Sequence, residues 1–352
     1  MDTRTRAAVL RWYRRVRRDL PWRRTRDPYA IWVSETMLQQ TRSETVLRYY
    51  ERFLRRFPTV RALARAPQSA VLAAWSGLGY YSRARNLHGA AKVIVRRHRG
   101  VIPCDVEALR ALPGVGRYTA GAVASIAFGL PAPIIDGNVA RVLTRWFAVD
   151  GDPRVPDVSR TLWQIAEGML DVRSPGDWNQ ALMELGATVC TPRVPACPRC
   201  PLKLCCRARR SRAVDRYPGR SARPVLRAAR QACVILQAGP RLLLTKRGDD
   251  EGLLAGLWEF PMVVVEADEE PEAALERRFT ELGIDAVGLC GGAPVIRILH
   301  TITTRRIETL VFRARRQPRG KLPGACWFRR AELAELPLSA VGLRIAAALT
   351  AT

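Results

Sequence analysis

The chain has 352 residues, enough for two domains that each bury a core of their own. No apolar run approaches the length needed to cross a bilayer, which argues against a membrane-spanning class and predicts a soluble protein. A formal net charge of +26 favours a polyanionic partner, with nucleic acid as the leading candidate. Only four of the 58 basic residues are lysines, and a codon preference is the alternative explanation of this bias towards arginine.

Arginines are concentrated in residues 11–26, and a predicted helix with the first catalytic candidate follows. Asp27 is a suitable N-cap, and Pro28 suits the first helical position. On this helix Glu35 interrupts an otherwise apolar face. Burial raises the pKa of a carboxyl group, and a carboxyl that stays protonated suits general acid catalysis. The alternative is a glutamate at the edge of that face, paired with an arginine such as Arg23.

Residues 1 to about 210 are predicted to be almost wholly helical. The clearest segment carries Val46, Tyr50 and Phe53 at helical spacing and ends before Pro58. The predicted helices span residues 44–57, 60–63, 70–75, 83–98, 106–112, 118–128, 139–147 and 159–170.

A glycine-containing loop joins two of these predicted helices at Leu112-Pro113-Gly114-Val115-Gly116. Glycine permits positive φ, and it lets backbone N–H groups at a helix N-terminus approach a phosphate. Most such loops are only tight turns. Between two helices of a strongly basic protein, however, the pattern indicates a helix-hairpin-helix that binds the DNA backbone.

A second carboxyl candidate, Asp136, lies just before the helix predicted to start near Val139. The helix dipole and the free N–H groups of the first turn are expected to keep this carboxylate ionised. Simple N-capping is the common alternative. A protonated acid at Glu35 and an ionised carboxylate at Asp136 together suit cleavage of a glycosidic bond through an oxocarbenium-like state.

The segment 190–206 carries closely spaced cysteines in the pattern Cys-x6-Cys-x2-Cys-x5-Cys, between prolines. A metal centre would neutralise clustered thiolates, and sulfur ligands select zinc or an iron–sulfur cluster. Disulfides are disfavoured because nine cysteines is an odd number and no signal peptide is recognised. Structural zinc is the main alternative, but one Cys-x2-Cys flanked by wide gaps favours a [4Fe–4S] cluster. The adjacent Cys205 and Cys206 leave the fourth ligand ambiguous.

Residues 211–228 are predicted to form a basic linker, because this arginine-rich stretch contains Pro218, Gly219 and Pro224. Beyond it the pattern changes to short apolar runs around Gly239-Pro240, which indicate a hairpin, then a helix over 271–282 and further strands. The second domain is therefore predicted to be α+β.

Taken in order, these motifs resemble those of the helix-hairpin-helix DNA glycosylases with an iron–sulfur cluster, most closely the adenine DNA glycosylases. The resemblance covers residues 8–210 closely and 225–345 loosely. The motifs that carry it are Leu20-Pro21-Trp22-Arg23, Ser34-Glu35-x-Met37-Leu38-Gln39-Gln40-Thr41, Gly77-Leu78-Gly79-Tyr80-Tyr81, Leu112-Pro113-Gly114-Val115-Gly116, Asp136-Gly137-Asn138-Val139 and the cysteine spacing.

The resemblance implies a multidomain chain. An all-α glycosylase domain over 1–210 would include the cluster loop 190–206, and a Nudix-like α+β domain would occupy 229–352. It also implies base excision repair of adenine opposite 8-oxoguanine or guanine in duplex DNA, by a monomer in the cytoplasm that associates with the nucleoid. The implied cofactor is a [4Fe–4S] cluster on Cys190, Cys197, Cys200 and Cys206.

Site roles follow from the resemblance residue by residue. Glu35 would protonate adenine N7 and later handle the water, while Asp136 stabilises the developing cation with Tyr118 and Asn138 beside it. Bifunctional relatives carry a lysine where this chain has Tyr118, and tyrosine cannot form an imine, which predicts a monofunctional enzyme. The expected adenine pocket comprises Trp22, Arg23, Leu38 and Glu184. The expected lesion and DNA contacts are Gln40, Thr41, Leu78, Tyr80, Gly114, Gly116 and Thr303.

The second domain departs from the Nudix and glycosylase patterns. Two metal-binding glutamates of a Nudix box are replaced by Arg277 and Thr280, which favours recognition over hydrolysis. The Phe-Ser-His of related lesion-contact loops is replaced by Ile302-Thr303-Thr304. Two alternatives therefore stay open: a glycosylase that prefers adenine opposite guanine, and a non-catalytic iron–sulfur DNA-binding protein. The paired carboxyls argue against the latter.

Overall fold

The computed structural model describes residues 2–221, 225–248, 252–302, 304–320 and 322–350. The chain divides into two compact units, each described by itself below. The first unit comprises Met1–Arg65 and Asn86–Ala222, and the second comprises Ala66–Arg85 and Arg223–Thr352. Within the described residues, no helix combines the length and apolar character that crossing a membrane requires.

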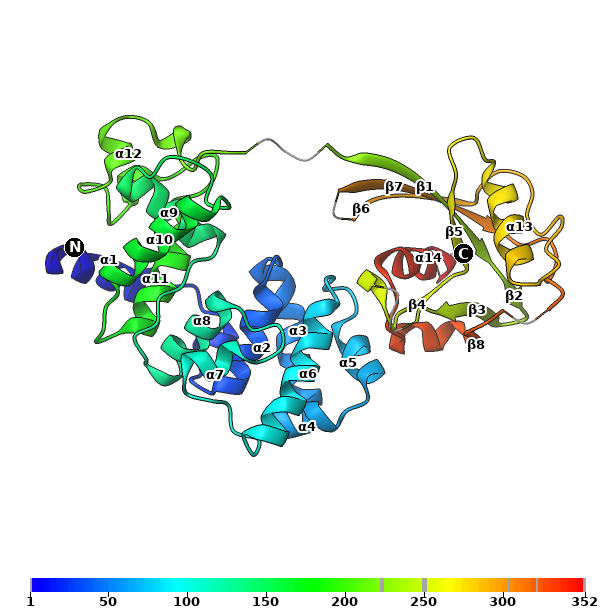
Figure 1. The fold of residues 1–352 in the computed structure, drawn as a ribbon, viewed down its shortest axis with the longest axis horizontal. Coiled ribbons are helices and arrows are strands. Elements are labelled where there is room, and N and C mark those ends of the chain that lie inside the picture. The colour runs from blue at the N-terminus through cyan, green and yellow to red at the C-terminus, as the bar shows by residue number, and fades with distance from the viewer. Residues whose placement is uncertain (1, 222–224, 249–251, 303, 321, 351–352) are drawn as a thin grey trace. The chain divides into compact units, whose positions relative to one another are not determined.

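The first unit is helical, as the sequence predicted (Figure 1). Every predicted helix is present to within a few residues, and three helices that the sequence analysis did not identify lie at Thr3–Val16, Pro175–Thr188 and Arg207–Arg210. The helices are α1 (Thr3–Val16), α2 (Pro28–Leu38), α3 (Ser43–Arg56), α4 (Val60–Arg65), α6 (Ser82–Arg97, shared with the second unit), α7 (Val106–Arg110), α8 (Arg117–Phe128), α9 (Gly137–Phe147), α10 (Pro156–Met169), α11 (Pro175–Thr188) and α12 (Arg207–Arg210).

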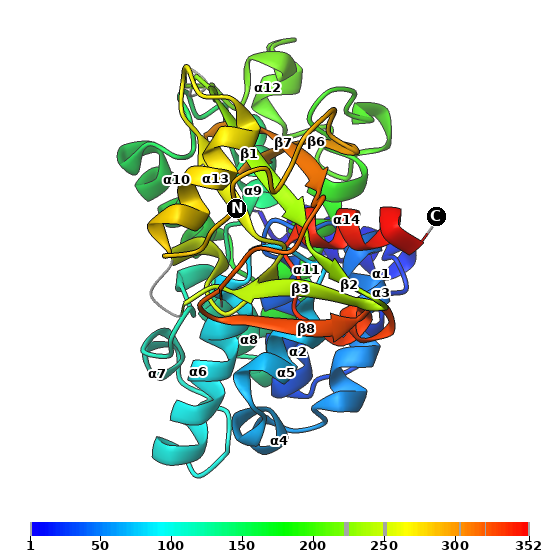
Figure 2. The same cartoon turned by 90° about the vertical axis from the view of Figure 1, so that its right-hand side faces the viewer.

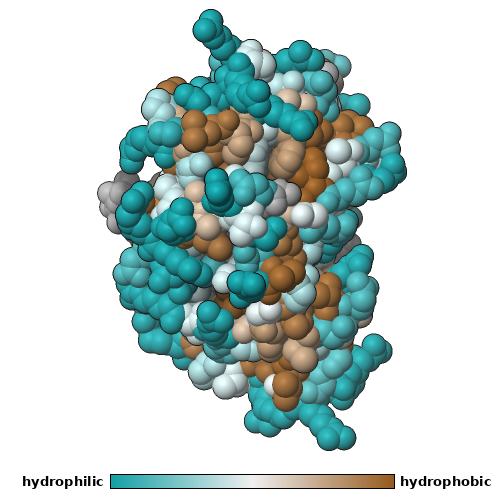
Figure 3. Space-filling model, turned by 90° about the vertical axis from the view of Figure 1, so that its left-hand side faces the viewer, coloured by the Kyte–Doolittle hydropathy of each residue, from teal (hydrophilic) through white to brown (hydrophobic). Residues whose placement is uncertain are grey.

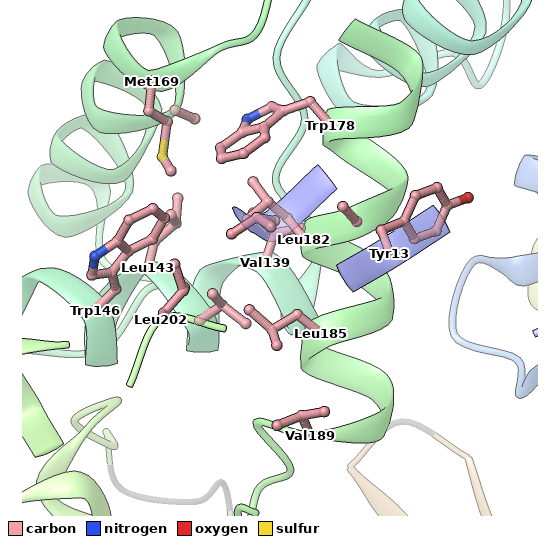
Figure 4. Close-up of a cluster of buried hydrophobic side chains, with 14 of the residues drawn as sticks. Tyr13, Val139, Leu143, Trp146, Met169, Trp178, Leu182, Leu185, Val189 and Leu202 are labelled. Atoms are coloured by element: carbon pink, nitrogen blue, oxygen red, sulfur yellow. The ribbon is translucent and has the colours of Figure 1, made fainter. Parts of the chain in front are cut away.

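Two of these unidentified helices, α1 and α11, help to build the core of the first unit. Figure 4 shows apolar side chains from α1, α9, α10 and α11 gathered into one cluster that includes Tyr13, Leu143, Trp178 and Leu182. Trp178 is 1% exposed and Leu182 2%. Because burial of each such side chain contributes about 2 kcal/mol, this cluster anchors α11 firmly beside α9.

The boundary between the two units lies within the predicted linker segment 211–228. Residues up to 221 pack on the first unit, and strand β1 already begins at Arg227. Tyr217 is buried, and its carbonyl accepts a 2.9 Å hydrogen bond from Nε of Arg145. The N–H of Ser221 donates to Asp152 at 2.8 Å. These hydrogen bonds hold residues 217–221 of the predicted linker against the first unit.

The second unit contains two sheets and their covering helices, an α+β arrangement as predicted (Figure 2). In the described residues one sheet has the order β5-β1-β7-β6, with β1 and β7 parallel; in the other, β3 pairs with β2, β4 and β8. The predicted hairpin is β2–β3, with Gly239 at a φ of +57°. The elements are α5 (Gln68–Trp75), β1 (Arg227–Ile235), β2 (Gln237–Ala238), β3 (Arg241–Lys246), β4 (Trp258–Glu259), β5 (Met262–Val265), α13 (Pro271–Glu281), β6 (Ile296–Ile302), β7 (Arg305–Arg313), β8 (Ala325–Arg329) and α14 (Ala340–Thr350).

The segment 66–85 belongs to the second unit by its contacts, although the sequence analysis placed it in the helical domain. The hydroxyl of Tyr81 donates a 2.7 Å hydrogen bond to the carbonyl of Leu338. Arg85 donates to the carbonyl of Ala255 at 3.1 Å. A boundary drawn from local sequence cannot detect such contacts, because the partners lie far away along the chain.

Candidate active site

An open pocket of about 870 Å³ lies in the first unit, where side chains from α2, α8, α9 and α11 meet. Its lining includes all four predicted catalytic residues, which are separated by as much as a hundred positions along the chain. They are Glu35, Tyr118, Asp136 and Asn138. The predicted adenine-pocket residues Trp22, Arg23 and Leu38 line it as well, and so do Gln40 and Thr41, which were predicted to contact the lesion.

Glu35 carries a buried carboxyl group in the last turn of the apolar helix α2. Residues 29–37 of α2 are all buried, and Glu35 is only 3% exposed. Burial raises its pKa to about 7. The hydroxyl of Tyr118 donates a 2.7 Å hydrogen bond to Oε2 of Glu35, which acts in the opposite direction by favouring the ionised form. The carboxyl is therefore poised to exchange a proton near neutral pH.

Arg23 is not the partner of Glu35, which decides between the two sequence interpretations. Its Nη2 instead donates to Oε2 of Glu184 at 2.7 Å, and Arg18 donates to the same carboxylate at 2.9 Å from Nε. Glu184 is fully buried; although burial raises its pKa, the hydrogen bonds from Arg18 and Arg23 prevail and lower it to about 2. Glu184 is absent from the pocket lining, so it acts by fixing the two arginines.

Asp136 is the N-cap of α9, as predicted, although the helix begins at Gly137. It accepts hydrogen bonds from the N–H of Val139 at 2.7 Å and from Nδ2 of Asn138 at 3.0 Å. Burial nevertheless raises the pKa of Asp136, with these hydrogen bonds opposing it. The expectation that the helix terminus alone sets its ionisation is therefore corrected: desolvation is the larger influence.

Arg141 on α9 was not anticipated from the sequence. Its Nη2 donates to Oδ1 of Asn138 and to the carbonyl of Gly186, both at 2.8 Å, and its Nε donates to the carbonyl of Cys190 at 2.7 Å. One guanidinium group therefore joins the carboxylate network of the pocket to the start of the cysteine segment. The only feature of the sequence that could have indicated this role is the position of Arg141, one helical turn after Gly137.

The predicted hairpin is present between α7 and α8. Gly114 has a φ of +72°, and a Cβ at this position would lie 2.5 Å from Cβ of Asn86. A side chain here would be both strained and obstructed. Gly116 caps α8 with a negative φ and open space around it, so only Gly114 needs the positive φ.

The remaining residues predicted to contact DNA or the lesion differ in how exposed they are. Leu78 is 5% exposed, Tyr80 is 57% exposed, and Thr303 lies outside the described residues.

Four cysteines line a single small pocket beside Arg145. They are the predicted set Cys190, Cys197, Cys200 and Cys206. The sulfur of Cys205 is directed elsewhere, 3.5 Å from the carbonyl of Leu202. Burial raises the pKa of Cys200 to about 12, and the neighbouring thiols add to the effect. Four soft ligands converging on one pocket suit a sulfur-bridged iron cluster, although no group of His, Cys, Asp or Glu in the described residues has the geometry of a metal site as it stands.

In the second unit, the position of a Nudix metal box carries an ion-pair network. Nε of Arg277 lies 2.8 Å from Glu269, and its Nη1 lies 3.0 Å from Glu281. Glu276 accepts a hydrogen bond from the N–H of Gly288. Arginine occupies the place of a metal-binding carboxylate and neutralises its neighbours, which agrees with the predicted loss of that site.

Two family models match the chain: the HhH-GPD superfamily base excision DNA repair proteins over residues 33–167, and the NUDIX domain over 231–348. It is 38% identical to the adenine DNA glycosylase of Rattus norvegicus, over 91% of this chain and 72% of the relative. Identity to the enzyme of Mus musculus is 40%, over 84% and 66%, and to that of Homo sapiens 41%, over 75% and 58%. The chain thus spans roughly six to seven tenths of the length of these relatives.

The helical unit is also similar to solved structures. A thermostable thymine-DNA glycosylase superposes with a TM-score of 0.54 at 31% identity, over 59% of this chain and 98% of that one. Endonuclease III in a non-covalent DNA complex gives 0.51 at 24% identity, which shows a shared fold.

Proposed function

The chain belongs to the adenine DNA glycosylase family, and from this premise we propose that it excises adenine mispaired with 8-oxoguanine or guanine in duplex DNA. The observation that carries the proposal is the pairing of Glu35 with Tyr118, in one pocket with Asp136. Because the pocket is concave and the target base is stacked in a duplex, the adenine must be flipped out to reach it. The protein acts on DNA as a monomer.

In the proposed reaction, neutral Glu35 donates its proton to N7 of the flipped adenine. The N-glycosidic bond then breaks, its electron pair leaves with the base, and the sugar becomes an oxocarbenium-like cation. Asp136, held by Val139 and Asn138, stabilises that positive charge electrostatically. Ionised Glu35 then takes a proton from the water that attacks the anomeric carbon, which restores the acid.

The pocket contains no amine nucleophile. Its lining, all within the described residues, includes no lysine, and the phenol of Tyr118 has a pKa raised well above its ordinary value by burial, so it stays a hydrogen-bond donor. An imine with the opened sugar therefore cannot form there. We infer a monofunctional glycosylase that leaves an intact strand with an abasic site.

A [4Fe–4S] cluster on Cys190, Cys197, Cys200 and Cys206 would cross-link the segment between α11 and α12. When bound, it would give structural order to this segment. Arg141 connects the segment to Asn138, so the order of the cysteine segment supports the position of the catalytic network. Thr303 of the second unit would contribute to recognition of the base opposite adenine.

The opposite base should control the rate. We expect single-turnover excision of adenine to be fastest opposite 8-oxoguanine, slower opposite guanine and undetectable opposite thymine. Thr303→Ala should lower the preference for 8-oxoguanine over guanine by roughly fivefold, the value of one hydrogen bond of about 1 kcal/mol. The neighbouring variant Thr301→Ala is the control. A preference equal for both purines in the unaltered chain would contradict the role in 8-oxoguanine repair.

The pH profile should report the hydrogen bond between Tyr118 and Glu35. Because the acid must be protonated, excision should fall as pH rises through about 7, the pKa of Glu35. The Tyr118 hydrogen bond lowers that pKa, so in Tyr118→Phe the fall should move to higher pH. Tyr29→Phe removes a different buried hydroxyl on α2, one that binds the carbonyl of Phe57, and should leave the midpoint unchanged. A midpoint that moves to lower pH in Tyr118→Phe would refute this assignment.

A further inference from the structure

The first unit has a second cavity, of about 410 Å³, with an unusual charge. It lies between the end of α1, the segment 23–26 and the N-terminus of α11. Arg23 and Gln180 line both this cavity and the reaction pocket, so the two adjoin. The charged residues of its lining are Arg14, Arg17, Arg23, Arg24, Arg26, Arg173 and Asp177.

Ion pairs neutralise only half of these arginines. Asp177, the one carboxylate of the lining, is bound by Arg14 through Nε at 3.0 Å and Nη2 at 2.9 Å. Arg23 and Arg24 pair with carboxylates outside the lining. In the described part of the chain, the lining arginines with no carboxylate within 4.0 Å are Arg17, Arg26 and Arg173.

A buried donor lies beneath two of these side chains. The guanidinium carbons of Arg17 and Arg23 lie 6.0 and 5.7 Å from the ring centroid of Tyr13. The Tyr13 side chain is fully buried, and its hydroxyl has no hydrogen-bond partner among the described residues. Figure 4 shows this hydroxyl pointing away from the apolar cluster. Tyr13 is not part of the cavity lining, so its ring supports the two guanidinium groups from beneath and leaves the outer N–H groups of Arg17 free for a ligand.

The N-terminus of α11 forms another part of the cavity lining. Ser174 is its N-cap but makes no capping hydrogen bond through its side chain, and Gly176 in the first turn also lines the cavity. A helix N-terminus carries partial positive charge and free N–H groups. Figure 3 shows that hydrophilic side chains cover much of one face of the molecule, so a hydrated arginine surface is the ordinary alternative. That alternative does not explain why guanidinium groups without a carboxylate partner gather around a concave site at a helix N-terminus.

We propose that this cavity binds a phosphate group. Arginine binds phosphate through charge-assisted, often bidentate hydrogen bonds, and the three guanidinium groups without a carboxylate partner more than neutralise a phosphate ester or free phosphate. The phosphate is supplied either by the DNA backbone or by a free ion or nucleotide. This site does not depend on the excision chemistry, and its ligand would lie one side chain, Arg23, away from the reaction pocket.

The test titrates inorganic phosphate into the full-length protein at constant ionic strength, followed by calorimetry. The unaltered chain should show saturable binding. The double variant Arg17→Gln/Arg173→Gln should bind at least about tenfold more weakly, since each lost contact is a hydrogen bond between charged groups. Arg96→Gln/Arg97→Gln removes two exposed arginines from α6 and should bind normally. Non-saturable binding, or equal losses in both double variants, would overturn the proposal.

A second arm identifies the source of the phosphate with undamaged duplex DNA, so that no excision is required. If the DNA backbone occupies the site, the Arg17→Gln/Arg173→Gln variant should bind duplex with a salt dependence shallower by about two contacts than the control. If a free phosphate or nucleotide occupies it, the two double variants should bind duplex alike while only the cavity variant loses phosphate. Either result supports the site, and failure of excision would leave both readouts intact.

Discussion

Glu35→Gln is expected to reduce single-turnover excision of adenine by about 10²- to 10⁴-fold, the usual contribution of a general acid. The amide keeps the shape of the side chain and can still accept the hydrogen bond from Tyr118, but it cannot deliver a proton to N7. Duplex affinity and thermal stability should change little. The measurement is the rate of base release with enzyme in excess over duplex.

Glu44→Gln is the matched control for this experiment. Glu44 lines the same pocket but its side chain is 73% exposed, and hydrogen bonds from its own backbone N–H and from Ser43 lower the pKa of its carboxyl, so it cannot serve as a protonated acid. Its replacement should leave the rate within a few-fold of the unaltered chain. Retention of most activity in Glu35→Gln, or equal losses in the two variants, would contradict the assignment of Glu35 as the acid.

Cys197→Ser is expected to bring iron and sulfide content down to background and to abolish the visible absorbance of the protein. A hydroxyl is a poor ligand for cluster iron in place of a thiolate. Without the cross-link, the segment between α11 and α12 should lose order, so the thermal unfolding temperature and duplex affinity should both fall. Iron and sulfide analysis, absorbance and thermal melting check this result independently of catalysis.

Cys205→Ser is the control, because Cys205 is adjacent to a proposed ligand but its sulfur lies near the carbonyl of Leu202 and outside the four-cysteine pocket. It should keep the cluster and the visible absorbance. Loss of iron in Cys205→Ser but not in Cys206→Ser would reassign the fourth ligand. A colourless unaltered protein that contains zinc would overturn the iron–sulfur proposal.

Local sequence was sufficient for the elements that end in clear signals. Asp27 and Pro28 located the start of α2, and the glycine of the hairpin located the loop before α8, because caps and positive φ depend on a few neighbouring residues. The two-domain architecture and the four candidate cysteine ligands were predicted from the order of the motifs along the chain. The helices α1 and α11 were not identified because their apolar residues are spaced among arginines or small residues, and their faces become clear only when they pack together.

Long-range pairing set the limits of prediction within the site. The sequence left open whether Arg23 pairs with Glu35; the structure pairs it with Glu184, a residue 161 positions away. That choice releases Glu35 from any ion pair with Arg23 and lets burial control its pKa. The contacts of Arg141 with Gly186 and Cys190, and those of Tyr217 with Arg145, depend equally on tertiary packing, which periodicity and spacing do not encode.

The same reasoning explains the balance of the two carboxyls. Both are buried, and burial raises the pKa of each. Asp136 receives a backbone and an amide hydrogen bond that favour its ionised form, whereas Glu35 receives one from a phenol. The proposed division of roles between acid and stabiliser therefore depends on the number and type of donors around each carboxyl, in addition to their position on a helix.

The central claim is that one pocket in the helical unit performs complete, monofunctional excision of adenine. Its most direct test is chromatographic identification of the base released from a duplex with adenine opposite 8-oxoguanine, with the product strand analysed before and after alkali. The account predicts free adenine in amounts equal to the abasic sites formed, and a strand that breaks only after alkali. Release of a different base, or strand breakage that accompanies base release without alkali, would contradict it.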